Sequence, residues 1–288
     1  MPWPIPPSEP RGRETLRRHY ELEKTLAERL RCAPKEERRR LYGAVYDELF
    51  RRLPDLPRLA DDPAALHRVV ELQARALEPL IRPGAVFLEI GAGAGALALR
   101  MASRAGRVYA VEASAQAAAG LAPPENFELV VSGSIRLDMA DESVDLAYSC
   151  HFLEHLHPDD ALEHAAEVRR VLRPDGSYLC VTPNRIWGPH DVSRYFDDVP
   201  TGLHLREYSH GDLARLFRRA GFRRAEALGG PGPGARPART RPVRPRALAE
   251  SLLERLPIAL RRRVLIALSR SRQPPYRTLE QVKVVGRV

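Results

Sequence analysis

Histidines and carboxylates that could carry out chemistry cluster in the middle of the chain. His151, Glu154 and His155 fall within five residues, and His204 lies further along. A neutral imidazole has a pKa suited to removing a proton from an alcohol near neutral pH. We therefore predict these four residues as catalytic candidates, with His155 or His151 as the base.

The same four side chains could instead hold a divalent metal ion. Two or three imidazoles with one carboxylate suit a zinc- or manganese-like ion that binds substrate hydroxyls. Spacing without geometry is poor evidence for a ligand set. The sequence therefore favours a site without a metal, and a metal held by His151, Glu154, His155 and His204 is the alternative.

A glycine-rich turn is the strongest local signal for a ligand site. Residues 86–90 form a short apolar run that contains Glu89, and Gly91, Gly93 and Gly95 follow at alternate positions before an Ala/Leu-rich run. This pattern predicts a strand, a tight turn and a helix. Glycines allow backbone angles closed to other residues and let a ligand approach bare backbone. The turn would present the free N–H groups of a helix N-terminus to that ligand.

The spacing Glu89-x-Gly91-x-Gly93-x-Gly95 resembles the first motif of class I S-adenosylmethionine-dependent methyltransferases. The dinucleotide-binding fingerprint needs a wider interval before its third glycine. In the methyltransferases this acid engages the amino-acid end of the cofactor, and the glycines let its backbone lie close. Glu112 ends the next predicted strand and matches the acid that accepts hydrogen bonds from the ribose hydroxyls.

Three further segments resemble the same family. Residues 141–149 are similar to the segment that leads into strand four, 150–156 to the Glu-His signature of small-molecule enzymes related to the ubiquinone-biosynthesis O-methyltransferases, and 171–176 to the turn before strand five. The adenine-contacting motif departs, because Ser134 stands where an acid is usual, and a hydroxyl binds an amino group more weakly than a carboxylate does. The resemblance implies S-adenosylmethionine as the cofactor and the following binding residues: Glu89, Gly91, Gly93, Gly95, Glu112, Ser134, Ile135 and Ser149.

A second resemblance concerns the candidate metal ligands. His151-x-x-Glu154-His155, followed by His204, is similar to the metal site of the small-RNA 3′-terminal 2′-O-methyltransferases, except that His151 replaces the first acid. This similarity implies an alternative substrate class, RNA, with a divalent ion at the site.

Alternating strands and helices must position these residues. Predicted strands cover 86–90, 108–111, 127–131, 144–149 and 177–182, and a last strand at 281–288 could enter the sheet antiparallel. The alternation predicts a parallel sheet covered on both faces. We predict an α/β fold with a Rossmann-like, seven-stranded, mostly parallel sheet, an N-terminal helical addition and a helical insertion before the last strand. Asp159 or Asp160 is the predicted cap of a helix at 159–172, and Ser209 of one at 211–220.

Composition divides the chain into three parts. Residues 1–62 are a predicted helical extension that packs on the core, or alternatively acts as a lid over the substrate pocket. The core covers 63–228 and 274–288. The insertion at 229–273 holds eleven arginines and two acids, so its charge of +9 equals the net charge of the whole chain. An anionic surface or a phosphorylated substrate could bind at 236–272, and a merely solvated basic face is the alternative.

These observations together favour an enzyme. The predicted function is S-adenosylmethionine-dependent methyl transfer to a small-molecule acceptor, most readily a hydroxyl. The first alternative is an RNA 2′-O-methyltransferase with a metal, and the second, ranked last, is a non-catalytic binding module on the same fold. No apolar run is long enough for a membrane span. The lack of a secretion signal and the separated Cys32, Cys150 and Cys180 favour a cytoplasmic protein.

Overall fold

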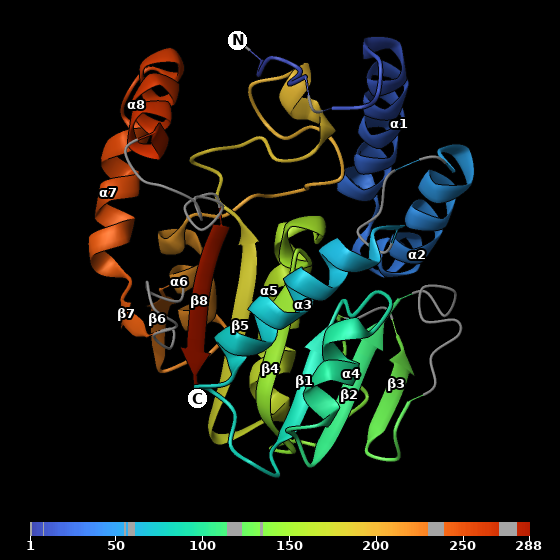
Figure 1. The fold of residues 1–288 in the computed structure, drawn as a ribbon, viewed down its shortest axis with the longest axis vertical. Coiled ribbons are helices and arrows are strands. Elements are labelled where there is room, and N and C mark those ends of the chain that lie inside the picture. Colours follow the sequence, from blue (N-terminus) through green and yellow to red (C-terminus); the bar gives the residue numbers. More distant parts are fainter. Residues whose placement is uncertain are drawn as a thin grey trace.

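A single mixed sheet organises the protein. The computed structural model describes residues 2–7, 9–54, 56, 61–113, 123–132, 135–229, 239–270 and 281–288. Eight strands lie in the order β3-β2-β1-β4-β5-β8-β6-β7 (Figure 1). Their bounds are β1 (Val86–Ile90), β2 (Arg107–Glu112), β3 (Phe127–Val131), β4 (Val144–Cys150), β5 (Leu172–Pro183), β6 (Arg224–Leu228), β7 (Thr240–Pro242) and β8 (Gln281–Arg287). Strands β1 to β5 are parallel, and β8 runs antiparallel to both β5 and β6.

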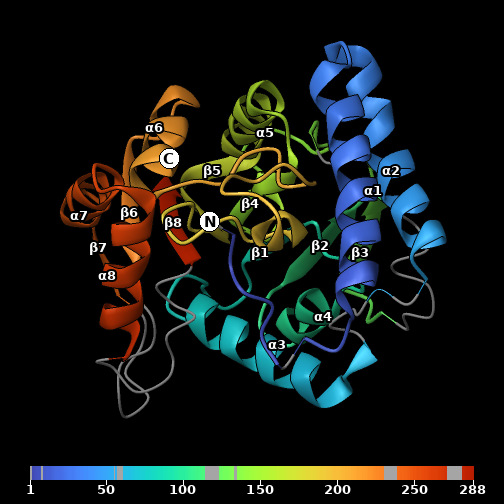
Figure 2. The ribbon, with the colours of Figure 1, turned by 90° about the horizontal axis from the view of Figure 1, so that it is seen from above.

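Helices cover both faces of the sheet. They are α1 (Arg13–Cys32), α2 (Lys35–Arg52), α3 (Pro63–Leu77), α4 (Ala96–Ala102), α5 (Pro158–Val171), α6 (His210–Arg219), α7 (Arg244–Glu254) and α8 (Ile258–Arg270), with short 3₁₀ turns η2 (Leu153–His155) and η3 (Val192–Tyr195). One core cluster joins α1, α2, α5 and α6 to one face of the sheet, and a second joins α3 and α4 to the other. Figure 2 shows these two layers from above.

Alternation along the strands explains the two cores. Leu88 and Ile90 of β1 point to the first cluster, whereas Phe87 points to the second. Neighbouring β4 repeats the pattern, because Ala147 faces the first cluster and Leu146 the second. A strand that is buried on both faces reads as a continuous apolar run. The fold class predicted from the sequence is therefore confirmed, including the antiparallel last strand.

The number of strands was predicted wrongly. The sheet has eight strands instead of seven, because Thr240–Pro242 pairs antiparallel with the end of β6. This edge strand has three residues, one of them proline, and lies between residues 229 and 245, where the Gly/Pro/Arg composition of the insertion predicts a loop. Three residues are too few to show a period of two, and a proline is tolerated only at a sheet edge.

Helix α5 begins differently from the prediction. His157 is its N-cap, with Nδ1 accepting a hydrogen bond from the Asp159 N–H at 3.3 Å, and Pro158 takes the first helical position. Neither Asp159 nor Asp160 caps the helix. The Ser209 cap of α6 is confirmed, in a capping box with Asp212. Asp160 was misassigned because its carboxylate serves a contact between helices.

That contact joins the N-terminal helices to the core. Arg38 of α2 donates from Nε to Oδ2 of Asp160 at 2.6 Å and from Nη2 to Oδ1 at 2.9 Å, and Tyr42 donates to Oδ2 at 2.7 Å. Both members of the ion pair are buried. The predicted packing of the extension against the core is thus observed, while its role as a lid and the three-part division of the chain stay predictions.

No helix within the described ranges has the length and hydropathy to cross a bilayer.

Candidate active site

The glycine turn lies where β1 ends and α4 begins. Gly91, Gly93 and Gly95 all have positive φ, at 68°, 53° and 66°. A Cβ at Gly91 would lie 2.9 Å from Cδ2 of Phe152, so that position is restricted by backbone angle and by space. The predicted strand, turn and helix are all present. Phe152, the second residue after β4, therefore lies directly beside the glycine turn.

Glu89 is buried next to this turn with unused bonding capacity. Its Oε2 atom has no hydrogen-bond partner among the described residues. Burial raises the pKa of Glu89 to about 8, together with the negative charge of Glu112 and against a backbone hydrogen bond from Ala98. A buried carboxyl oxygen without a hydrogen-bond partner destabilises the folded state, unless a ligand supplies a donor or a cation. It therefore fits the cationic amino group of an amino-acid-like ligand.

Glu112 holds the turn in shape. Its Oε2 accepts a hydrogen bond from the Gly93 N–H and its Oε1 from the Ala113 N–H, both at 2.8 Å. A carboxylate in this place, at the end of β2 and beside the glycine turn, is a group that can accept hydrogen bonds from ribose hydroxyls. The residues present thus fit S-adenosylmethionine at its amino-acid end and its ribose.

The other predicted cofactor residues are placed less directly. Ile135 is buried in the core, and Ser134 lies outside the described residues. Ser149 is fully buried, and its hydroxyl is 2.8 Å from the hydroxyl of Tyr178. Cofactor contact by Ser134, Ile135 and Ser149 stays a prediction.

The catalytic candidates converge beyond β4. Glu154, His155 and His204 offer ligand atoms that lie within 4.8 Å of one another. The rings of His155 and His204 meet edge to face, with centroids 5.0 Å apart. Residues separated by the whole of α5 and β5 are therefore brought together, as the sequence predicted.

His151 is not part of that group. Its Nδ1 is 3.1 Å from Oε1 of Glu154, but its Nε2 is 3.1 Å from Nε2 of Gln281 on β8 and its ring is half exposed. Its backbone has a φ of +53°, a left-handed conformation that is uncommon for a residue other than glycine. His151 therefore contacts the candidate site through Glu154 only.

Each histidine of the group is oriented by an oxygen on Nδ1. His155 lies 3.1 Å from the Leu203 carbonyl, which can only accept, so Nδ1 carries the proton and Nε2 keeps its lone pair. Burial lowers the pKa of His155, and the charge of Glu154 offsets this only in part. Nε2 of His155 is therefore available as a base.

His204 has the opposite electrostatic setting. Its Nδ1 is 2.8 Å from Oε1 of the buried Glu207. Burial alone would lower the pKa of His204, but this hydrogen bond and the charges of Glu154, Glu207 and Asp191 raise it to about 9. Burial would raise the pKa of Glu154, yet the hydrogen bond and charge of His151 hold it at about 2. The two histidines thus present one neutral and one cationic ring.

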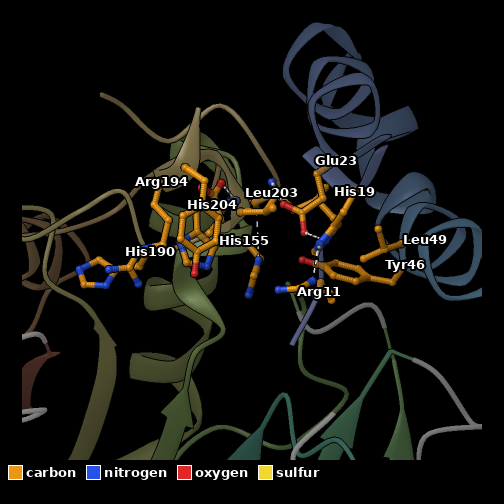
Figure 3. Close-up of a pocket in the computed structure, with 13 residues that line it drawn as sticks. Arg11, His19, Glu23, Tyr46, Leu49, His155, His190, Arg194, Leu203 and His204 are labelled. Atoms are coloured by element: carbon orange, nitrogen blue, oxygen red, sulfur yellow. Dashed lines mark hydrogen bonds and ion pairs between the residues drawn. The ribbon is translucent and has the colours of Figure 1, made fainter. Parts of the chain in front are cut away.

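A cavity of about 300 Å³ lies against these rings (Figure 3). Its wall combines the N-terminal region with the segments that follow β4 and β5. The lining residues are Arg11, His19, Glu23, Tyr46, Leu49, His155, His190, Asp191, Val192, Arg194, Tyr195, Leu203 and His204. Helices α1 and α2 therefore do more than pack on the core, since they complete this pocket.

Among the lining residues that were not predicted as site residues, five belong to the N-terminal region: Arg11, His19, Glu23, Tyr46 and Leu49. A usable signal was present on α1, where His19 and Glu23 are polar residues on a face otherwise made of leucines. Their spacing lets Nε2 of His19 lie 2.7 Å from Oε1 of Glu23.

Comparisons with known proteins agree with the site. A family model described as "Methyltransferase domain" matches residues 88–180. A probable S-adenosylmethionine-dependent methyltransferase of Mycolicibacterium smegmatis is 37% identical over 93 residues, which are 32% of this chain and 34% of that protein. This chain thus spans about a third of the relative's length.

Solved structures share the fold. One comes from a complex between the Haloferax volcanii Trm112 methyltransferase activator and a protein named as "the putative methyltransferase", at a TM-score of 0.53 and 16% identity, over 79% of this chain and 93% of that one. Another is a possible histamine N-methyltransferase of Thermotoga maritima, at a TM-score of 0.50 and 17% identity, over 83% and 97%. Residues 88–180, which contain the glycine turn, Glu89 and Glu112, thus match a methyltransferase domain and resemble an S-adenosylmethionine-dependent methyltransferase.

Proposed function

We propose that the whole chain transfers a methyl group from S-adenosylmethionine to a hydroxyl of a small-molecule acceptor. The observation that carries this proposal is the place of His155, which lines the cavity of about 300 Å³ and has its Nδ1 3.1 Å from the Leu203 carbonyl. The cavity is of the size of small-molecule sites. Phe152 touches the glycine turn, and His155 stands three residues later in the pocket wall. The cofactor turn and the acceptor pocket therefore share one short segment.

The residues of this chain have separable tasks in the reaction. Glu89, Glu112 and the three glycines hold the cofactor, which when bound supplies a methyl group on a sulfonium. The acceptor hydroxyl would give its proton to Nε2 of His155 while its oxygen bonds to the methyl carbon, and the carbon–sulfur bond would break to leave a neutral thioether. The Leu203 carbonyl keeps His155 in the required tautomer. Alignment of donor and acceptor supplies most of the rate gain in such a displacement.

Cofactor binding should depend on pH through Glu89. Because this carboxyl has a raised pKa of about 8, it must lose a proton to pair with a cationic amino group. Between pH 6 and 7.5 we expect the affinity for S-adenosylhomocysteine to rise by about tenfold per pH unit. Calorimetric titration at several pH values measures this slope. Glu89→Gln should bind weakly with no slope, and an unchanged affinity in that variant would contradict the assignment.

A metal-assisted reaction is the second candidate. It is favoured by the convergence of Glu154, His155 and His204, because oriented imidazoles with one carboxylate can form a three-ligand catalytic site. Such an ion would bind two neighbouring hydroxyls, as at an RNA 3′ end. The same titrations with EDTA or added Mn²⁺ and Zn²⁺ distinguish the candidates, since only the second predicts a metal effect. A non-catalytic module would be supported if no cofactor bound at all.

We also infer that the helical insertion contacts an anionic membrane surface. Leu248 and Leu252 of α7 are 64% and 54% exposed, and Leu260 and Ile266 of α8 are also exposed. Exposed Arg244, Arg255 and Arg263 lie among them. The two acids of these helices are occupied, Glu250 with His210 and Glu254 with Arg185. The three exposed arginines form no ion pair with any residue in the described ranges, and apolar side chains between such cations fit a lipid interface better than a phosphorylated small molecule.

Vesicle sedimentation tests this inference. The protein should sediment with vesicles that contain phosphatidylglycerol. With vesicles of pure phosphatidylcholine it should remain in the supernatant. The double variant Leu248→Glu/Leu252→Glu should weaken binding by about tenfold or more. Leu72→Glu on α3 is the matched control, because Leu72 is 57% exposed on another part of the surface. Equal loss in the control, or no binding to either vesicle, would refute the membrane contact.

A further inference from the structure

Arg194 on η3 is a cation in the pocket wall that has no acidic partner among the residues the structure describes. It lines the cavity, and its buried Nε makes no hydrogen bond with any described residue. Its guanidinium also forms no ion pair with an acidic side chain in the described ranges. A partly buried charge without a counter-charge is unfavourable unless a ligand provides one.

The acids of the pocket are already engaged elsewhere. Glu23 pairs with His19 and accepts a hydrogen bond from the Leu203 N–H at 3.2 Å. Asp191 accepts one from the Ser193 N–H at 3.1 Å, which caps η3. Within the described residues, neither carboxylate forms an ion pair with Arg194.

The second arginine of the pocket differs in this respect. Arg11 donates from Nε to Oε1 of Glu9 at 2.7 Å and from Nη2 to Oε2 at 3.0 Å, so its charge is neutralised by a two-point ion pair. The contrast singles out Arg194 as the cation that the fold leaves for a ligand.

Aromatic rings hold Arg194 in position. Its guanidinium carbon is 5.7 Å from the ring centroid of Trp3 and 5.9 Å from that of Tyr195. The Trp3 N–H donates to the Arg194 carbonyl at 2.8 Å, which ties the N-terminal segment to η3. A planar guanidinium fixed in this way suits two parallel hydrogen bonds to a carboxylate.

We propose that the acceptor is a small hydroxy acid, about one ring in size, whose carboxylate binds Arg194 and whose hydroxyl faces His155. This proposal rests on the proposed function above. Both residues line the same 300 Å³ cavity, and Tyr46 and Tyr195 give it aromatic walls. The anion fixes which atom of the acceptor reaches the base, so Arg194 acts as a specificity residue.

Matched ligands test the proposal on the full chain. The probes are the three monohydroxybenzoates and, for each, a neutral analogue (its twin) in which a hydroxymethyl group replaces the carboxylate. Calorimetry with S-adenosylhomocysteine present should show that at least one acid binds about tenfold or more tighter than its twin. Arg194→Met should abolish that difference, and Arg194→Lys should keep part of it. Arg68→Met, at an exposed position on α3, should behave as wild type.

Several results would overturn the proposal. These are equal binding of acid and twin, an acid preference that survives in Arg194→Met, or no binding of any probe to a protein that does bind S-adenosylhomocysteine. The titrations are repeated without the nucleoside. Failure of S-adenosylhomocysteine to bind would contradict the proposed function, while the comparison of acid with twin still reports on Arg194.

Discussion

Replacing His155 by glutamine is expected to lower kcat for methyl transfer by about 10²- to 10⁴-fold, the usual contribution of a general base. Glutamine keeps a donor for the Leu203 carbonyl but offers no basic nitrogen. The affinity for S-adenosylhomocysteine should stay unchanged, because the contact of the segment with the glycine turn is made by Phe152. Release of S-adenosylhomocysteine, measured with a saturating hydroxy acid, gives kcat.

The control for this variant is His67→Gln, since His67 is an exposed histidine on α3. Equal rates for wild type and His155→Gln would remove His155 from the chemistry. If activity instead returned on addition of Zn²⁺ or Mn²⁺, the metal-assisted reaction would be the better account of Glu154, His155 and His204.

The second large effect concerns stability. Arg38→Met should lower the free energy of unfolding by about 3–5 kcal/mol, because it leaves the carboxylate of Asp160 buried without a counter-charge. Asp160 is fully buried and Arg38 nearly so. The remaining hydrogen bond from Tyr42 cannot neutralise the charge. Urea unfolding followed by circular dichroism measures the change.

A neighbouring ion pair provides the comparison. Arg29 and Glu48 join α1 to α2 with N···O at 2.7 Å, but both side chains are accessible to water. Arg29→Met should therefore lower the free energy of unfolding by no more than about 1 kcal/mol. Adding Asp160→Asn to Arg38→Met should restore part of the stability. If Arg38→Met and Arg29→Met lowered the free energy of unfolding by similar amounts, burial of the Arg38–Asp160 pair would not account for the effect of Arg38→Met.

Local patterns made the cofactor half of the site predictable. Glu89, the glycines and Glu112 belong to two neighbouring strands and one turn, so their spacing in sequence determines their spacing in the fold. His204 could be grouped with His155 because the ends of parallel strands meet at one edge of a sheet. The fold class followed from the same alternation of strands and helices.

Contacts between distant segments were not predictable in this way. Tyr46 reaches His155 across more than a hundred residues, and nothing in the sequence near Tyr46 marks it as a pocket residue rather than a core residue. Its side chain meets the His155 ring edge to face, with centroids 5.7 Å apart. His151 has a positive φ, and no feature of the sequence near it predicts this conformation. Such positions are decided by tertiary packing.

The place of β8 in the sheet has a consequence for biosynthesis. This strand follows every other element in the chain, yet it lies between β5 and β6 and pairs with both. Before β8 has been synthesised, β5 and β6 each have one unpaired edge. Unpaired strand edges can associate with other chains. The parallel half can assemble earlier, from β1 to β5. We expect the nascent chain to need protection by chaperones until its final strand closes the gap.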